Sequence, residues 1–259
     1  MKIGPSGRRL LDLMPRILTY NVHRCVGTDR RLDVGRVAKV IAAYNPDIVA
    51  LQELDVGRMR TGMVDQAHEI AHQLDMTFHF NPAMKVEEEL YGDALLTRYP
   101  ERLVQRAPLP GYGRLGGLLE PRGALWLAVD VDGVEVQVIN THLGLVPREQ
   151  QAQAESLAGA AWLEHPLCKG PTILLGDFNA TSGSVVHRIL TRRLRDARER
   201  ISGRREPTTT FPSKMPVLRI DHIFVNEAVK VDRIVAPFGP LTRTASDHLP
   251  LIADFSVTP

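Results

Sequence analysis

The chain has 259 residues, of which 44% are hydrophobic, 24% charged and 5% aromatic, and its formal net charge is +2. This composition is typical of a globular protein and excludes a disordered or collagen-like chain. The small net charge excludes a strong polycation, and the two cysteines, Cys25 and Cys168, form no CxxC pair, which excludes a disulfide framework.

The N-terminal stretch MKIGPSGRRLLDLMPR contains basic residues but no apolar run as long as a signal peptide requires. No window approaches the length of a membrane span. We therefore predict a soluble, cytoplasmic protein without stable membrane insertion, and the sequence indicates no obligate protein partner. Residues 1–13 match no element of a fold, so we expect a tail followed by a single domain over 14–259. Met14 is a candidate native start, which N-terminal sequencing tests; a native start at Met1 would end that idea.

The first half of the chain alternates short apolar runs with helical spacing. We predict strands at 17–22, 47–51, 77–80 and 94–97, and helices at 33–43 and 66–74. Asp33 is suited to cap the first helix, and Asn45-Pro46 ends it. Residues 99–122 contain several prolines and glycines and are predicted to form a loop.

The second half begins with a hairpin at 125–131 and 134–140, joined by the turn sequence Asp132-Gly133. Helices are predicted at 148–163 and 184–190, strands at 172–175, 220–225, 231–235 and 251–255, and a loop at 202–216. No repeat or low-complexity linker divides the chain. Mixed hairpins and crossover helices predict sheets covered by helices.

Polar side chains with chemical capacity stand where several of these strands end. Glu53 closes the apolar run DIVALQE, and a carboxylate there must reach solvent, form a pair or bind a cation. Asn21 closes ILTYN in the same way. A strand-end glutamate that emerges into water, or an asparagine in a turn, explains each residue equally well by itself.

Asp177 and Asn179 follow the strand TILLG and, being two residues apart, project to the same side. The carboxylate can orient and deprotonate a water molecule, and the amide can donate to a phosphoryl oxygen. A simple turn after a strand is the alternative for these two residues.

His142 and His248 also stand at strand ends, and Asp247 precedes His248. Asp221 is a candidate for fixing the tautomer of His248. Hard carboxylate and amide oxygens favour Mg²⁺, Mn²⁺ or Ca²⁺ over zinc. The chain has no HExxH, GxSxG or GxxxxGK[ST] sequence. Together these residues indicate metal-assisted hydrolysis of a phosphate ester.

Six segments resemble, in order, the motifs of the endonuclease/exonuclease/phosphatase superfamily: LTYNVH, DIVALQELD, INTHLG, ILLGDFNAT, RIDHIFV and TASDHLPLIADF. The resemblance runs from about Ile17 to about Phe255. It implies an α/β (α+β) fold of the DNase I type, a four-layer sandwich of two packed mixed β-sheets flanked by helices. It also implies a divalent-metal-dependent phosphoric ester hydrolase that uses Mg²⁺, Mn²⁺ or Ca²⁺.

The resemblance assigns roles to particular residues. The implied metal-site residues are Glu53, as principal ligand, Asn21 and Asp247. The implied catalytic residues are Asp177, Asn179, His142, His248 and Asp221. Arg122 resembles an arginine that binds the substrate phosphate. Asp93 stands where many small bacterial members carry asparagine, and we expect it to orient His142.

The substrate is a phosphate ester of one of several classes. We expect a nuclease first, because residues 187–205 are rich in arginine and arginine clusters bind nucleic-acid backbones. A solvated basic helix explains the same residues. A phospholipid or small-molecule phosphodiesterase or phosphatase is the alternative, with residues 109–119 as a candidate apolar loop. An inactive binding scaffold is the third reading, and the retained carboxylates and histidines argue against it.

Overall fold

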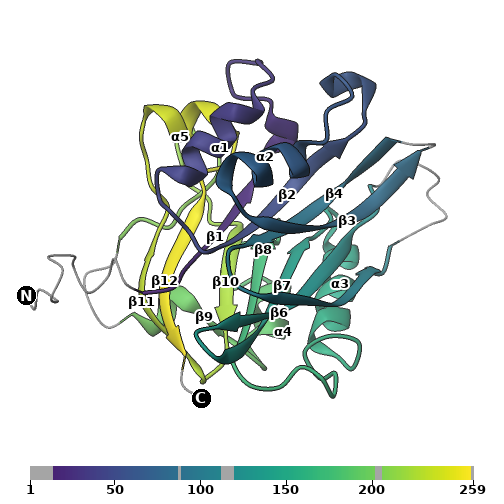
Figure 1. The fold of residues 1–259 in the computed structure, drawn as a ribbon. Coiled ribbons are helices and arrows are strands. Elements are labelled where there is room, and N and C mark those ends of the chain that lie inside the picture. The colour runs from purple at the N-terminus through teal and green to yellow at the C-terminus, as the bar shows by residue number, and fades with distance from the viewer. Residues whose placement is uncertain (1–13, 87–88, 112–119, 202–205, 258–259) are drawn as a thin grey trace, which may run out of the picture.

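Two six-stranded sheets packed against each other form the body of the molecule in a computed structural model (Figure 1). The structure describes residues 14–86, 89–111, 120–201 and 206–257. The predicted tail, residues 1–13, lies outside these ranges. In the described part of the chain, no helix is long and apolar enough to cross a membrane.

The first sheet has the strand order β11-β12-β1-β2-β4-β3. Its strands are β1 (Arg16–Asn21), β2 (Ile48–Val56), β3 (Thr77–Val86), β4 (Glu89–Thr97), β11 (Val229–Val235) and β12 (Leu251–Val257). β1 and β2 run parallel, and the other neighbours are antiparallel. The helices α1 (Val34–Ala42), α2 (Gln66–Leu74) and α5 (Pro240–Ala245) share a buried apolar cluster with this sheet and cover its outer face.

The second sheet has the order β5-β6-β7-β8-β10-β9. Its strands are β5 (Glu101–Pro108), β6 (Gly123–Val131), β7 (Val134–His142), β8 (Thr172–Asp177), β9 (Arg195–Asp196) and β10 (Asp221–Val225). Here β7 and β8 are the parallel pair. The helices α3 (Pro147–Ala158) and α4 (Val185–Leu190) pack on the outer face, and 3₁₀ turns occupy His23–Cys25, Met59–Thr61 and Ala197–Arg200.

The alternation of side chains along β6 shows how the layers form. Leu125, Leu127 and Val129 belong to the cluster between the two sheets, whereas Ala124 and Trp126 belong to the cluster under α3 and α4. Successive residues of a strand point to opposite faces, so a strand buried on both faces reads as a continuous apolar run. The predicted four-layer sandwich is confirmed.

Local sequence signals predict where most of the helices begin and end. The Asp33 side chain accepts a hydrogen bond from the backbone N–H of Arg36 at 2.8 Å and caps α1 as predicted. α2 has its predicted bounds. The helix predicted over 148–163 ends earlier, at Ala158, because Gly159 takes an extended conformation.

The prediction that residues 99–122 form one loop is wrong, because β5 lies within them and pairs with β6. β5 is an edge strand whose side chains are exposed or half-buried throughout. It therefore lacks the continuous apolar run of a central strand, and its register shifts between Leu103 and Gln105. Periodicity cannot identify such a strand.

The two parallel pairs occupy the middle of their sheets, and β1 contacts β8 across the sandwich. β1, β2, β7 and β8 thus bring their C-terminal ends toward one region. Asn21, His142 and Asp177 are the last residues of β1, β7 and β8, whereas Glu53 lies inside β2, which runs beyond the predicted strand end at residue 51.

Candidate active site

A β-bulge turns Glu53 out of the first sheet. Leu51 lies opposite Ala94 but Leu54 lies opposite Gly92, so β2 carries an extra residue against β4. Glu53 has a φ of 61°, a left-handed conformation that costs a non-glycine residue about 1–3 kcal/mol. The surrounding pairing maintains this conformation, and the Glu53 side chain lines a pocket at the strand ends.

Asn21 links the two sheets at this point. Its Nδ2 donates to Glu53 Oε1 and to Asp177 Oδ2, both at 2.9 Å. Its Oδ1 accepts the backbone N–H of His23 at 3.0 Å, which fixes the orientation of the amide. In this orientation Asn21 offers the carboxylates hydrogen rather than oxygen, so the predicted contact with a metal ion would require the amide to turn.

Asp177 ends β8, opposite His142 on β7 and Asp221 on β10. Gly176 beside it has a φ of 144°, and a Cβ there would lie 1.9 Å from the carbonyl oxygen of Thr141, so only glycine fits. Asn179 is left-handed as well, and its backbone N–H donates to Asp177 Oδ1 at 2.8 Å. The backbone around Asp177 thus fixes the position of its carboxylate.

His248 and Asp221 make the predicted contact, with His248 Nδ1 at 2.9 Å from Asp221 Oδ2. Burial disfavours a charged ring, but Asp221 and Asp177 outweigh it and raise the pKa of His248 to about 10. His248 is therefore cationic near neutral pH, and its Nε2 lies 3.7 Å from Asp177 Oδ2. Burial and the Asp221 charge raise the pKa of Asp177.

His142 has a different partner from the one predicted. Arg122 Nη1 lies 3.0 Å from His142 Nδ1, and the Asn179 amide nitrogen lies 3.1 Å from His142 Nε2. That Nε2 is 3.6 Å from Asp177 Oδ2. Burial and the Arg122 charge lower the pKa of His142 well below its ordinary value, so the ring is neutral. Asp93, which we expected to orient His142, accepts the backbone N–H of Glu53, and burial raises its pKa to about 8.

Most of the predicted residues meet in one pocket of about 360 Å³. Those that line it are Glu53, Arg122, His142, Asp177, Asn179, Asp247 and His248. Asn21, Asp93 and Asp221 are buried and contact lining residues from behind. Sequence reasoning missed the lining residues Arg24, Arg60, Tyr91, Glu120, Leu145 and Phe211. A signal was available for Arg24, Arg60 and Leu145, because each lies within four residues after the end of a strand that carries a site residue.

The pocket suits a divalent cation. Glu53 makes no ion pair among the described residues, although its carboxylate is only partly exposed. Asp247, also half-buried, lines the same pocket. Asp177, Asp221 and His248 also have ligand atoms within 4.8 Å of one another, but the cationic His248 already lies beside both carboxylates, so Glu53 and Asp247 are the better cation ligands. Carboxylate oxygens without a positive partner are the donors that Mg²⁺, Mn²⁺ and Ca²⁺ prefer.

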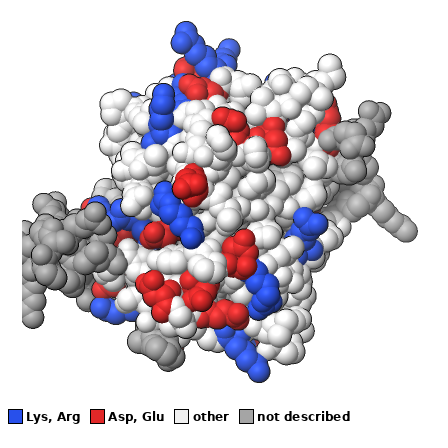
Figure 2. All heavy atoms as spheres, viewed as in Figure 1, with Lys and Arg blue, Asp and Glu red and all other residues white. Residues whose placement is uncertain are grey.

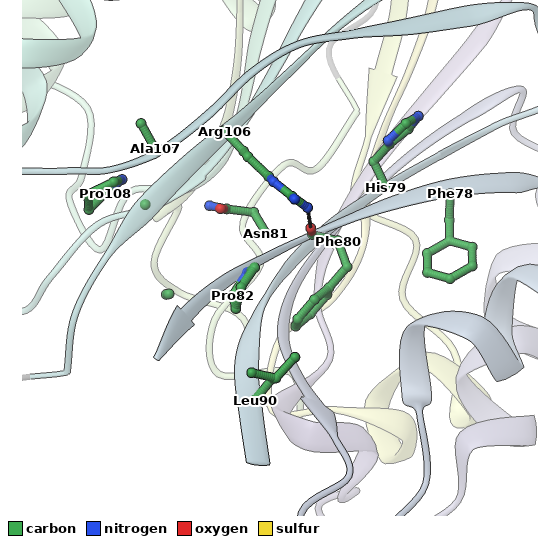
Figure 3. A pocket seen from close by; sticks show the side chains of 11 residues that line it. Phe78, His79, Phe80, Asn81, Pro82, Leu90, Arg106, Ala107 and Pro108 are labelled. Atoms are coloured by element: carbon green, nitrogen blue, oxygen red, sulfur yellow. Dashed lines mark hydrogen bonds between the residues drawn. The ribbon is translucent and has the colours of Figure 1, made fainter. Parts of the chain in front are cut away.

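A larger cavity of about 840 Å³ lies between the edge strands β3 and β5 (Figure 3). Phe78, Phe80 and Leu90 form part of its wall, and Arg106 reaches across it to donate to the carbonyl oxygen of Phe80 at 3.2 Å. Among the described residues, no carboxylate lines this cavity. It lacks the groups that phosphoester hydrolysis requires, so the smaller pocket is the candidate active site.

A second group with metal-ligand spacing consists of His187, Asp196 and His222. Arg219 donates to both oxygens of Asp196, at 2.9 and 2.7 Å, and so already occupies the carboxylate with a positive charge. His222 Nε2 lies 2.8 Å from the carbonyl oxygen of Ala180. This buried cluster therefore holds the segment after β8 against β10 rather than a metal ion.

The described part of the arginine-rich segment, residues 187–201, does not line the pocket. Arg193 pairs with Glu164, and Arg195 pairs with Glu227 at 3.5 Å. On the face shown in Figure 2, basic and acidic side chains are interspersed rather than gathered by sign. Among the described residues, this segment offers no arginine to a ligand in the pocket.

Comparisons with known proteins agree with this geometry. A family model described as the endonuclease/exonuclease/phosphatase family matches residues 18–248. The chain is 28% identical over 250 residues to the uncharacterized protein YbhP of Escherichia coli, covering 92% of this chain and 95% of that protein.

Solved structures share the fold. A functionally unknown protein from Enterococcus faecalis has a TM-score of 0.75 at 22% identity, covering 94% of this chain and all of that one (100%). A mannosyl-6-phosphatase from Bacteroides thetaiotaomicron has a TM-score of 0.74 at 18% identity, covering 93% of this chain and 99% of that one. The chain therefore belongs to the endonuclease/exonuclease/phosphatase family and is a metal-dependent phosphoric ester hydrolase.

Proposed function

We propose that the protein hydrolyses a small phosphate ester in this pocket with the help of a divalent cation, Mg²⁺ in the first place. One observation carries the proposal. The buried carboxylate of Asp177 lies 3.6 Å from His142 and 3.7 Å from His248, and Asn21 connects it to Glu53. A water-activating base, two histidine rings and a cation ligand thus surround one point.

Asp177 acts as the base in this proposal. Its raised pKa lies closer to neutral pH than that of an ordinary carboxyl group, and a general base is most effective when its pKa is near the working pH. It orients a water molecule for attack on phosphorus in line with the leaving oxygen, and accepts its proton.

The remaining residues stabilise the charge that develops on the phosphoryl oxygens. The cationic Nε2–H of His248 and the amide of Asn179 donate to these oxygens, and the neutral ring of His142 lies beside them. Arg122 positions this ring through its contact with His142 Nδ1. A divalent cation held by Glu53 and Asp247 would supply Lewis-acid stabilisation of the leaving oxygen.

The small volume of the pocket, and the pairing of arginines in the arginine-rich segment with glutamates, favour a small ester over nucleic acid as substrate. Arg193 and Arg195 of that segment pair with Glu164 and Glu227, and none of its described residues, 187–201, lines the pocket. A mannosyl-6-phosphatase has the same fold. The expectation of a nuclease stays a prediction, and the same assay tests it.

The test is a hydrolysis panel on the purified full chain with Mg²⁺, Mn²⁺ or Ca²⁺. The substrates are p-nitrophenyl phosphate, sugar phosphates, inositol phosphates, bis(p-nitrophenyl) phosphate, sphingomyelin, plasmid DNA, abasic duplex and RNA. Glu53→Gln is compared with Glu155→Gln, a matched change on the exposed face of α3. Metal-dependent cleavage of small esters, lost only in Glu53→Gln, is expected. Faster cleavage of nucleic acid would replace the small-ester assignment with a nuclease, and no turnover of any ester would contradict the proposal.

A further inference from the structure

The chain leaves β1 through a left-handed turn that forms part of the pocket wall. His23, Arg24 and Cys25 have φ values of 45°, 57° and 57°. Three successive non-glycine residues in this region are strained, and such strain persists only where the surrounding structure imposes it. The turn is held by burial of Cys25, by the backbone bond from Val26 to His23 at 2.9 Å, and by Gln66 Nε2, which donates to the carbonyl oxygen of Arg24 at 2.8 Å.

His23 orients the guanidinium of Arg24. His23 Nδ1 lies 3.1 Å from the carbonyl oxygen of Val26, so Nδ1 carries the ring proton. His23 Nε2 then accepts a hydrogen bond from Arg24 Nη2 at 2.8 Å. The imidazole thereby fixes the arginine without neutralising its charge.

The charge of Arg24 has no counterpart in the described part of the chain. No carboxylate pairs with it there, and its buried Nε has no hydrogen-bond partner. The other pocket arginines each have a carboxylate partner: Arg60 contacts Asp55 at 2.7 and 2.6 Å through Nε and Nη2, and Arg122 contacts Glu120 at 2.9 Å. A cation held in a pocket wall without a carboxylate partner is a site for an anion.

Arg60 belongs to the same wall. Its guanidinium also lies 5.6 Å from the ring centre of Tyr91, so Asp55 and Tyr91 hold it in place and leave Nη1 available. Arg24 and Arg60 follow β1 and β2 of the first sheet, whereas His142 and Asn179 come from the second sheet. A phosphoryl group bound at Asp177, between the two histidines, therefore leaves the two arginines for another anionic group.

We propose that Arg24, oriented by His23, and Arg60 form a second anion subsite, so that the preferred substrate is a small phosphate ester that carries a second phosphate group. The proposal rests on the proposed function for the position of the phosphate that is hydrolysed. Arg24 and Arg60 act in substrate binding, and the pocket distinguishes bisphosphates from monophosphates.

The experiment measures binding by isothermal titration calorimetry with Mg²⁺ present, on the full chain carrying Asp177→Asn to prevent turnover. The ligands are 1,3-propanediol bisphosphate, propyl phosphate and the dinucleotide pTpT. Arg24→Gln is compared with Arg30→Gln, because Arg30 is also left-handed, with a φ of 64°, but is exposed and outside the pocket. Thermal melting confirms that each variant is folded.

The bisphosphate is expected to bind about 10-fold more tightly than propyl phosphate, which is the size of one charge-assisted contact. Arg24→Gln should bring this ratio close to one, and Arg30→Gln should leave it unchanged. Equal binding of the two ligands by the parent, or an unchanged ratio in Arg24→Gln, would overturn the subsite. Tighter binding of pTpT than of the small bisphosphate would overturn the small-molecule assignment. If no ester is hydrolysed but the bisphosphate still binds more tightly than propyl phosphate, the proposed reaction is rejected and the subsite remains. If small esters are hydrolysed but the two ligands bind equally, only the subsite is rejected.

Discussion

Replacement of Asp221 by asparagine should move the whole pH–activity profile toward acid. The Asp221 carboxylate lies 2.9 Å from His248 Nδ1 and is fully buried. It raises the pKa of His248, against the effect of burial, and together with burial it raises the pKa of Asp177. Removal of this negative charge therefore lowers both pKa values. The base Asp177 ionises at lower pH, and the cationic His248 loses its proton at lower pH.

The size of the effect follows from the protonation of His248. If its pKa falls from about 10 to the ordinary 6.5, about 3% of the molecules keep a cationic ring at about pH 8, roughly 30-fold fewer than in the parent. At about pH 6 most molecules of both proteins keep it. Asp221→Asn should thus be impaired far more at the alkaline end than at the acid end.

The assay is metal-dependent hydrolysis of bis(p-nitrophenyl) phosphate, stopped with alkali so that the product is read at one pH. NMR titration of ¹³C-labelled histidine follows the His248 ring directly and does not depend on turnover. Parallel pH profiles, or a His248 pKa that stays near 10 in the variant, would refute the assignment of Asp221 as the group that holds His248 charged.

Four further changes test other parts of the structure. Chelation of divalent cations should abolish turnover by the parent, and Glu53→Gln should raise the cation concentration needed for half-maximal rate; a rate independent of added cation would contradict the metal site. Gly176→Ala places a methyl group 1.9 Å from the Thr141 carbonyl oxygen, so it should prevent folding or lower the melting temperature sharply, and a near-parental melt would refute the packing described here. Asp196→Asn breaks a buried charge network and should cost about 3–5 kcal/mol in urea unfolding near neutral pH. Burial disfavours the Asp196 charge, but hydrogen bonds from the His187, His222 and Arg219 side chains hold its pKa well below 3.8; its stabilisation is therefore present above that value and shrinks as pH falls, and a pH-independent difference would contradict the network.

Much of the fold follows from local signals. The apolar runs of the central strands, the Asp-Gly turn of the β6–β7 hairpin and the Asp33 cap each specify an element within a few residues, because these signals depend on near neighbours. These local signals do not identify β5, because this edge strand is defined by its pairing with β6 rather than by its own hydrophobic pattern.

The site shows the same division. The position of Glu53, Asp177 and His248 beside apolar runs of the sequence was enough to predict them as site residues. The partner of His142 could not be found in this way, because Arg122 stands twenty positions earlier and meets it only through the β6–β7 pairing. The left-handed residues, among them Arg24, are held by tertiary contacts that no local pattern encodes.

The position of β12 has a consequence for the order in which the molecule is completed during synthesis. Beside β1 in the first sheet, β12 pairs Arg16 with Asp254 across 238 positions of the chain (Figure 1). Until β12 has left the ribosome, one edge of β1 remains without its partner and is open to pairing with another chain. His248 is made just before β12, long after Glu53. The pocket is therefore assembled only late in synthesis, and it depends on a long-range pairing of the kind that forms slowly.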